Sequence, residues 1–331
     1  MTNTINRKTF LRGVGAAGAA FALGRAPALA QARQQITYMF AGPTVLPAFA
    51  PHMIAKHKGY FAAEGIEPRF VTGQGGADVA TQVGAGNAEA GGGIGDTTMV
   101  VRPNGVPVRA VALLGGGGLH QLFIREDAGI TDPRNLRGKT IAVQSFQDTS
   151  YYALLGTLAR LGLTRNDVTI QAAGPAGIVQ LLVNGTAQAM VGVFDFALAA
   201  EAGGVRLRRF SLRDYFPSMA QTVIVSDTTI AQRPQLVRAI VRPLLKALGE
   251  IIADPTKAID DYLAAVPENA GRREQMAAAI RAYAQYVYAG QAQLGAFNPD
   301  ELRTLQEFYL REGIIRRAVP LDELYTNAFV S

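Results

Sequence analysis

The sequence predicts an α/β protein with two lobes, and three observations support this prediction. Its 331 residues are about twice the length of an ordinary domain of ~150 residues. Short runs rich in β-branched residues alternate with stretches of helical periodicity, which is the pattern of helices packed on largely parallel sheets. The apolar share of 49% and the charged share of 18% are typical of a chain that buries a core. The composition therefore excludes a wholly disordered protein.

The elements expected in the first part of the chain alternate regularly. Strands are expected at residues 35–40, 68–72, 90–94 and 108–114. Helices are expected at residues 48–61 and 77–85, and a further helix begins at residues 95–97. The first helix is predicted because bulky side chains recur there at helical spacing, namely Phe49, Met53, Ile54, His57 and Phe61.

A second α/β unit is expected after residues 120–121. Its strands are predicted at residues 140–143, 168–171 and 190–193, and its helices at residues 150–161 and 176–183, with another starting at residue 194. A strand at residues 222–226 leads out of this unit, and most of the remaining chain has helical periodicity. Helices are expected at residues 234–253, with a kink at Pro243, at residues 272–288, and from Asn298 to about Glu312.

The first 30 residues resemble a secretory signal peptide. Arg7, Lys8 and Arg12 precede a short Gly/Ala-rich apolar run, and Ala28-Leu29-Ala30 forms an exit of small residues. The apolar run is too short to span a bilayer. The basic pair resembles a twin-arginine signal with Lys in place of the second Arg, so both export routes remain open. We expect cleavage near Ala30, with an uncleaved anchor as the alternative.

The charge balance argues against nucleic-acid binding. The formal net charge is +6, but four of the 32 bases lie in the first 32 residues, which contain no acid. Removing them leaves 28 bases against 26 acids, so the mature chain has no strong field for capturing phosphates.

Residue usage also narrows the possible chemistry. The chain has no cysteine, which excludes disulfides, thiolate nucleophiles and zinc–cysteine sites. His52 and His57 are five residues apart, unlike the i, i+4 pair of a zinc-binding helix, and are interpreted as surface or cleft-edge residues. No catalytic triad or pair of carboxylates can be assembled. We therefore expect neither a metal, a cofactor nor an enzyme.

Several ordered segments carry a family resemblance. They read AKHKGYFAAEGI at residues 55–66, GQGG at 73–76, Gly95-Asp96, NLRGKTIAV at 135–143 and GLT at 162–164. In this order and at these spacings they resemble the solute-binding proteins of ABC importers, specifically the nitrate/sulfonate/taurine and thiamine-pyrimidine group. The resemblance covers essentially the whole mature chain.

The resemblance implies a type II periplasmic-binding fold, with two α/β lobes joined by two crossover strands and a ligand cleft between them. Lobe one would hold residues 34–122 and 226–331, and lobe two would hold residues 123–225. The crossover strands would be Gln121 to Arg125 and Thr222 to Ser226.

Ligands of open α/β sheets bind beyond the C-terminal ends of the strands, where helix N-termini offer N–H donors. The cleft candidates are therefore the strand-end loop residues. In lobe one they are Gly42, Pro43, Thr44, Gly75, Gly76, Asp96, Thr97 and His120. In lobe two they are Ser145, Phe146, Gln147, Asp148, Thr149, Gly174, Phe194, Asp195 and Phe196. The glycines would let backbone approach a ligand, although each could equally serve a plain turn.

The candidate loops contain no Arg or Lys, so a bound sulfonate or nitrate would depend on amides and hydroxyls alone. Phe146, Phe194 and Phe196 could stack on a flat ring, although they could also be core residues. Asp96, Asp148 and Asp195 could accept from a ring amino group, although a helix cap is the commoner role for Asp at these positions. These features favour a neutral or weakly cationic, pyrimidine-like heteroaromatic ligand, with a sulfonate, nitrate or taurine-type anion as the alternative.

The predicted function is that of a periplasmic receptor which delivers a small organic solute to an ABC permease and its ATPase at the inner membrane. A monomer is expected. The group also resembles a synthase that makes the thiamine pyrimidine, but that resemblance implies a cysteine-rich iron motif, which this chain lacks. A periplasmic sensor that docks a membrane kinase is the other alternative.

Overall fold

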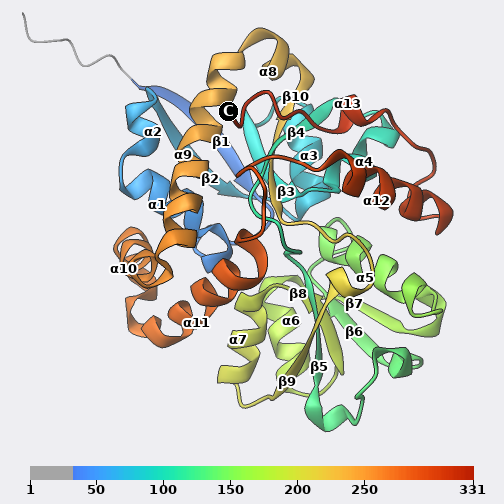
Figure 1. The fold of residues 1–331 in the computed structure, drawn as a ribbon. Helices are drawn as coiled ribbons and strands as arrows, with labels where there is room; N and C mark the ends of the chain where they lie inside the picture. Colours follow the sequence, from blue (N-terminus) through green and yellow to red (C-terminus); the bar gives the residue numbers. More distant parts are fainter. Residues whose placement is uncertain (1–32) are drawn as a thin grey trace, which may run out of the picture. The chain divides into compact units, whose positions relative to one another are not determined.

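Two five-stranded sheets organise the part of the chain that the computed structural model describes, residues 33–331 (Figure 1). The signal peptide expected at residues 1–30 lies outside the described residues. The first sheet has the order β2-β1-β3-β10-β4 and consists of β1 (Gln34–Phe40), β2 (Ile66–Thr72), β3 (Ala90–Ile94), β4 (Val108–Leu113) and β10 (Gln221–Ser226). The second has the order β7-β6-β8-β5-β9 and consists of β5 (Gln121–Arg125), β6 (Thr140–Val143), β7 (Thr169–Ala172), β8 (Ala189–Gly192) and β9 (Leu207–Ser211).

Both sheets are mixed, which corrects the expectation of largely parallel sheets. β1 runs parallel to β2 and β3, but β10 is antiparallel to both β3 and β4. In the second sheet β6 runs parallel to β7 and β8, but β5 is antiparallel to both β8 and β9. The antiparallel strands, β5 and β10, are each the first strand after the chain crosses from one sheet to the other.

The chain passes between the sheets twice, through residues 114–120 and residues 212–220. The two segments that the resemblance assigned to the crossover strands follow these passages, and each is an internal strand of one sheet. The first passage contains four consecutive glycines, three of which, Gly115 to Gly117, pack against residues 286–290. A Cβ on Gly117 would lie 1.9 Å from the Tyr286 carbonyl oxygen, so these three positions have no room for side chains.

Helices follow most of the strands. Those before the second passage are α1 (Ala50–His57), α2 (Tyr60–Ala63), α3 (Gly76–Gly84), α4 (Thr97–Val101), α5 (Thr149–Arg160), α6 (Gly174–Val183) and α7 (Phe194–Ala202). The single helix expected at residues 48–61 is instead a 3-10 turn at Pro47–Phe49 followed by α1 and α2. The break lies at Gly59, whose φ of 72° is left-handed and ends the helix.

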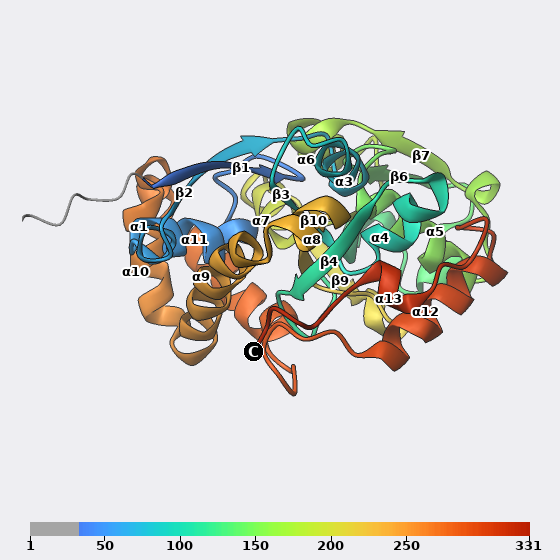
Figure 2. The same ribbon diagram turned by 90° about the horizontal axis from the view of Figure 1, so that it is seen from above.

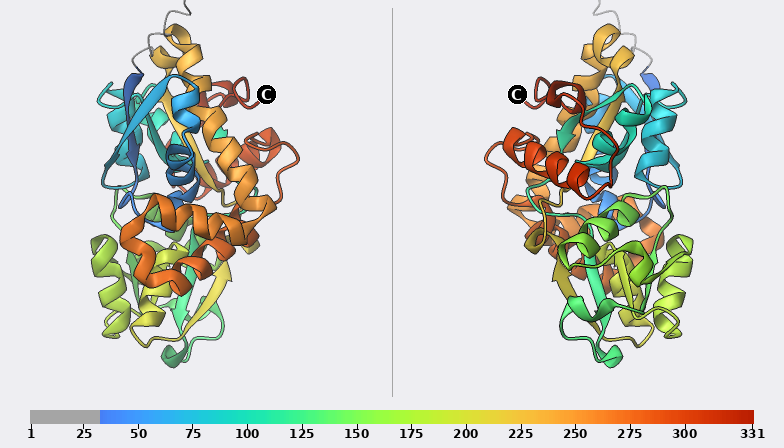
Figure 3. Two further views of the ribbon diagram at one scale, coloured as in Figure 1. Left: turned by 90° about the vertical axis from the view of Figure 1, so that its left-hand side faces the viewer. Right: turned by 90° about the vertical axis from the view of Figure 1, so that its right-hand side faces the viewer.

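The C-terminal third is helical, as expected. It contains α8 (Asp227–Gln232), α9 (Pro234–Ala253), α10 (Pro255–Ala265), α11 (Arg273–Tyr283), α12 (Pro299–Arg311) and α13 (Leu321–Leu324). α9 continues through Pro243, and the Asn298 side chain caps α12 as the sequence predicts. Figure 2 shows α9 and α10 beside α1, on which both pack. α11 packs on α7, which follows β8 of the second sheet (Figure 3), so the C-terminal helices contact helices that flank both sheets.

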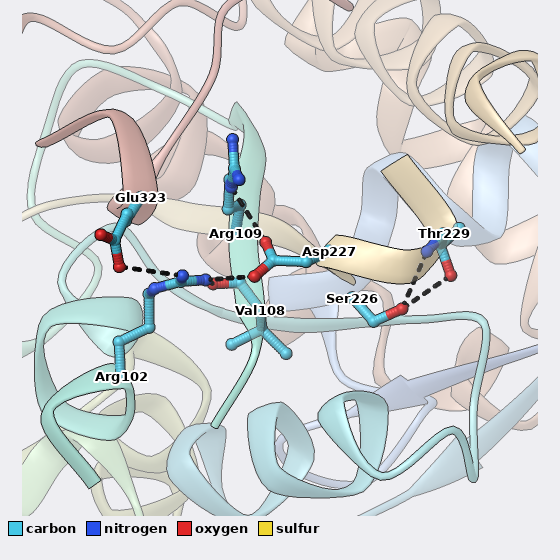
Figure 4. A network of polar contacts seen from close by, with 7 residues as sticks. All are labelled: Arg102, Val108, Arg109, Ser226, Asp227, Thr229 and Glu323. Carbon is cyan, nitrogen blue, oxygen red and sulfur yellow. Dashed lines mark hydrogen bonds and ion pairs between the residues drawn. The ribbon is translucent and has the colours of Figure 1, made fainter. Parts of the chain in front are cut away.

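A polar network fastens the C-terminal segment to the first sheet (Figure 4). The Arg102 guanidinium pairs with Asp227 at 2.9 Å and with Glu323 at 3.1 Å, and it also donates to the Val108 carbonyl oxygen. Arg109 pairs with the same Asp227 carboxylate at 2.9 Å. The network therefore joins β4, the start of α8 and α13. None of the helices at residues 33–331 is both long and apolar enough to cross a membrane.

Candidate functional site

A cavity lies where the C-terminal ends of the central strands of the two sheets face each other. About 40 Å³ of it is accessible to the centres of water molecules, within about 540 Å³ of space between protein atoms that includes open solvent. Lobe one contributes the end of β1, the segment before α1, and the end of β3, including Phe40, Gly42, Phe49, His52 and Gly92. Lobe two contributes the loop before α5 and the start of α7, including Gln144, Asp148, Thr149 and Phe196. Leu119 and His120, from the first passage, and Gln221, at the start of β10, complete the wall.

Direct contacts close the two lobes over one side of this cavity. The Ser145 hydroxyl donates to the Gln74 carbonyl oxygen at 2.7 Å, and the Ala77 N–H donates to the Gln147 carbonyl oxygen at 3.1 Å. Gly75 lies so near the opposite lobe that a Cβ there would be 2.5 Å from the Cα of Asp148. The structure is therefore in a closed arrangement, with the N-termini of α3 and α5 facing each other.

Three rings contribute to the lobe-one wall, among small and aliphatic residues. Phe40 and Phe49 stack with ring centroids 4.2 Å apart, and His52 lies edge-on to Phe40 at 4.9 Å. Phe196 adds a ring from lobe two. Rings arranged in this way offer flat, apolar surface to a ligand.

The polar groups of the cavity are predominantly neutral. Burial lowers the pKa of His52 to about 3, so its imidazole is uncharged at neutral pH. Burial also lowers the pKa of His120, an effect that the Asp148 carboxylate partly opposes across 3.9 Å. Among the described residues that line the cavity, Asp148 is the only acid and there is no lysine or arginine.

The structure separates the candidates chosen from strand ends into three groups. The residues that line the cavity are Gly42, His120, Asp148, Thr149 and Phe196. A second, outer cavity at the lobe junction shares Gly42 and Gln144 with the first, inner cavity. The candidates that line only this outer cavity are Pro43, Ser145, Phe146, Gln147 and Gly174. The remaining candidates line neither: Thr44, Gly75, Gly76, Asp96, Thr97, Phe194 and Asp195.

Most of the candidates that line neither cavity have partners within the protein. Gly75 and Gly76 contact Asp148 and Thr149 across the closed lobes. Phe194 packs against Phe123, Tyr283 and Tyr286 on the side of α7 away from Phe196. The Thr97 hydroxyl accepts from the Ile94 N–H at 2.9 Å, which orders the turn into α4.

The three aspartates at helix starts divide in their roles. Asp148 is a helix cap, since its carboxylate accepts from the Ser150 N–H at 2.9 Å. Asp96 and Asp195 do not cap with their side chains and instead accept from the hydroxyls of Tyr309 and Tyr283. Burial raises the pKa of both carboxyl groups to about 6.

Several cavity residues were missed by the strand-end rule. Phe40 and Phe49 lie within elements whose apolar side chains indicate a core rather than a cleft. His52 was predicted to be a surface or cleft-edge residue, but its side chain is buried, being 2% exposed, although it does line the cavity. His57, for which the same prediction was made, is exposed. No sequence signal distinguishes Gln221 from its neighbours in β10.

Residues 46–258 match the model of the family described as NMT1/THI5 like. The chain belongs to this family. It is 29% identical over 290 residues to the riboflavin-binding protein RibY of Chloroflexus aurantiacus, a match covering 85% of this chain and 82% of that protein. It is 23% identical over 238 residues to the 4-amino-5-hydroxymethyl-2-methylpyrimidine phosphate synthase of Aspergillus parasiticus, covering 66% of this chain and 67% of the synthase.

Solved structures establish the fold. A protein from Bordetella bronchiseptica superposes with a TM-score of 0.75 at 20% identity, over 90% of this chain and 96% of that one. The alkanesulfonate-binding protein SsuA of Xanthomonas axonopodis has a TM-score of 0.70 at 16% identity, over 89% and 98%. The periplasmic nitrate-binding protein NrtA of Synechocystis has a TM-score of 0.70 at 13% identity, over 90% and 87%. The fold is therefore that of periplasmic binding proteins, with two α/β lobes, as the sequence predicts.

Proposed function

We propose that this NMT1/THI5-like protein is the periplasmic solute receptor of an ABC importer and captures a small, uncharged heteroaromatic solute between its lobes. The observation that carries the proposal is a predominantly apolar cavity at the strand ends, which is lined in part by the rings of Phe40, Phe49 and Phe196 and in which no described lining residue is lysine or arginine. Lobe one would comprise residues 34–122 and 226–331, and lobe two would comprise residues 123–225. The chain would be exported with cleavage near Ala30 and would act as a monomer.

Electrostatics argues against an anionic solute. A buried anion requires a cation or several unused N–H donors. At the start of α5 the first-turn N–H of Ser150 is already occupied by the Asp148 carboxylate, which adds negative charge to the same wall. An anion entering the cavity would therefore meet a like charge and no lysine or arginine.

The relatives contribute two kinds of precedent. RibY is named for binding riboflavin, whose flat ring system would suit the aromatic walls described here. SsuA and NrtA are named for binding an alkanesulfonate and nitrate, which makes an anion the alternative ligand. The likeness to these two structures supports the fold rather than the ligand.

A synthase role has less support from this chain. The resemblance to the pyrimidine synthases implies chemistry on a lysine and an iron motif rich in cysteine. No lysine is among the described residues lining the cavity, and the sequence has no cysteine. Receptor function needs only binding and lobe closure, for which the contacts at Gly75 and Ser145 are suited.

The test is calorimetric titration of the purified protein, supported by thermal unfolding, with five probes: riboflavin, 4-amino-5-hydroxymethyl-2-methylpyrimidine, taurine, an alkanesulfonate and nitrate. A ligand at 100 times its Kd adds about 2.7 kcal/mol to the free energy of unfolding and raises Tm. We expect at least one ring compound to bind and the anions not to bind. Binding of anions alone would reject the proposed ligand class, and formation of the pyrimidine phosphate by the purified protein would favour the synthase.

A further inference from the structure

His52 is a buried polar side chain with no hydrogen-bond partner among the described residues. It lies on α1, is 2% exposed, and neither Nδ1 nor Nε2 has a partner. The Tyr38 hydroxyl, on β1, is likewise buried and unpartnered, and the two rings lie 4.8 Å apart between centroids. Leaving such groups unpaired is costly, so they are normally satisfied by a partner.

Only one of these two groups lines the cavity. His52 forms part of its lobe-one wall. Tyr38 is not a lining residue: it packs behind His52 and Gly92, and a Cβ on Gly92 would lie 3.7 Å from the Tyr38 hydroxyl oxygen.

A third unpaired group comes from the neighbouring strand. Oε1 of Gln221 is buried without a partner, and Gln221 also lines the cavity. It lies on β10 opposite Ile94 of β3, two residues along from Gly92. The wall formed by α1, β1, β3 and β10 therefore carries several unpaired hydrogen-bonding atoms among apolar rings.

These atoms include both donors and acceptors. A neutral imidazole has one N–H donor and one acceptor nitrogen, a tyrosine hydroxyl can donate, and an amide oxygen only accepts. A sulfonate or nitrate can accept hydrogen bonds but cannot donate, so it would leave the imidazole acceptor and Gln221 Oε1 unpaired. A ring edge with an N–H next to a carbonyl, or an amino group next to a ring nitrogen, could satisfy both kinds of atom.

We propose that His52 and Gln221 read the donor and acceptor pattern on the edge of the ligand ring and thereby reject solutes that only accept hydrogen bonds. This inference rests on the proposed function and adds to it the hydrogen-bonding class of the ligand and the residues that select it. His52 is thus a specificity residue rather than one more member of the aromatic core.

Replacing His52 separates this role from simple packing. His52→Phe keeps an aromatic ring among Tyr38, Phe40 and Phe49 but removes both nitrogens, so folding should be preserved. His52→Gln restores one donor group and one acceptor in a neutral side chain. The matched control is His57→Phe, which makes the same substitution at an exposed position of the same helix.

The experiment is calorimetric titration of all four proteins with riboflavin and with 3-methylriboflavin, in which a methyl group blocks the ring N–H. We expect His52→Phe to weaken riboflavin binding by roughly 10- to 100-fold, His52→Gln to recover at least part of the affinity, and His57→Phe to match the wild type. Methylation should weaken binding to the wild type much more than to His52→Phe. If the aminopyrimidine is the tighter probe for the wild type, it replaces riboflavin, and its N,N-dimethylamino derivative, which has no ring-amino N–H, replaces 3-methylriboflavin.

The outcomes distinguish the two proposals. If the wild type binds neither ring compound, the proposed function fails. If the wild type binds a ring compound and folded His52→Phe binds it equally well, only this inference is overturned. Equal losses on methylation in the wild type and in His52→Phe would also overturn it.

Discussion

Gly75→Ala should hold the lobes apart and weaken ligand binding without unfolding either lobe. The added Cβ would lie 2.5 Å from the Cα and 2.8 Å from the backbone nitrogen of Asp148, where carbon contacts normally begin near 3.5 Å. The lobes would have to separate by about 1 Å to relieve this clash. Separation on that scale breaks the bonds from Ser145 to Gln74 and from Ala77 to Gln147, which are now 2.7 and 3.1 Å long.

The size of the effect follows from those two hydrogen bonds. Each contributes roughly 0.5–1.5 kcal/mol, so the closed state should lose about 1–3 kcal/mol, equivalent to a roughly 5- to 150-fold weaker Kd by calorimetry. Gly75 also has a φ of 130°, which alanine adopts only with strain. Gly59→Ala is the control for that strain, because its φ is 72° and nothing lies within 4 Å of the added Cβ. If Gly75→Ala binds as tightly as the wild type, lobe closure at this contact is not part of binding.

Three further perturbations test other parts of the structure. Asp96→Asn should gain stability relative to the wild type as pH rises. Burial raises the Asp96 pKa from 3.8 to about 6, so the protonated carboxyl stabilises the folded wild type at low pH, and this stabilisation is lost as pH rises between those two values. Denaturant unfolding at pH 4 and pH 7 should show a relative gain of up to roughly 3 kcal/mol in the free energy of unfolding, and a pH-independent difference would contradict this reasoning. Tyr286→Ala removes a ring that stacks on Phe194 and whose centroid lies 4.1 Å from the Arg209 guanidinium carbon. Ligand release measured by stopped flow should therefore accelerate roughly 5- to 30-fold. An unchanged rate would mean that these contacts do not stabilise the closed lobes. Arg102→Ala removes the ion pairs to Asp227 and Glu323 and should lower the free energy of unfolding by about 1–3 kcal/mol. The Kd should not change, because these residues do not line the cavity. A changed Kd would show that the polar network and the cavity are coupled.

Much of the fold could be predicted from local sequence patterns. Runs such as Thr140–Val143 are rich in β-branched residues and bounded by turns, so most strands were placed within a residue, whereas β2 begins at Ile66, two residues before the strand expected at residues 68–72. β9 was missed because Leu207–Ser211 contains two adjacent arginines and lacks apolar alternation. The prediction of one continuous helix at residues 48–61 was wrong because the helix ends before Gly59. The spacing of apolar side chains does not show that this glycine has a left-handed backbone conformation.

The candidate site was only partly predictable for a different reason. The strand-end rule found Asp148 and His120 because position along a strand is a local property. The partners of Asp96 and Asp195 are tyrosines 213 and 88 residues away in the sequence, which no local pattern indicates. His52 was missed as a buried residue because one helix turn cannot show which face meets a cavity wall.

A crystal structure of the protein with its tightest ring ligand would test the central claim most directly. The account predicts electron density for the ring between the two sheets, against Phe40 and Phe49, with its polar edge toward His52. Density in the surface cavity beside Arg213 and Gln291 instead, with the inner cavity filled by side chains, would contradict it.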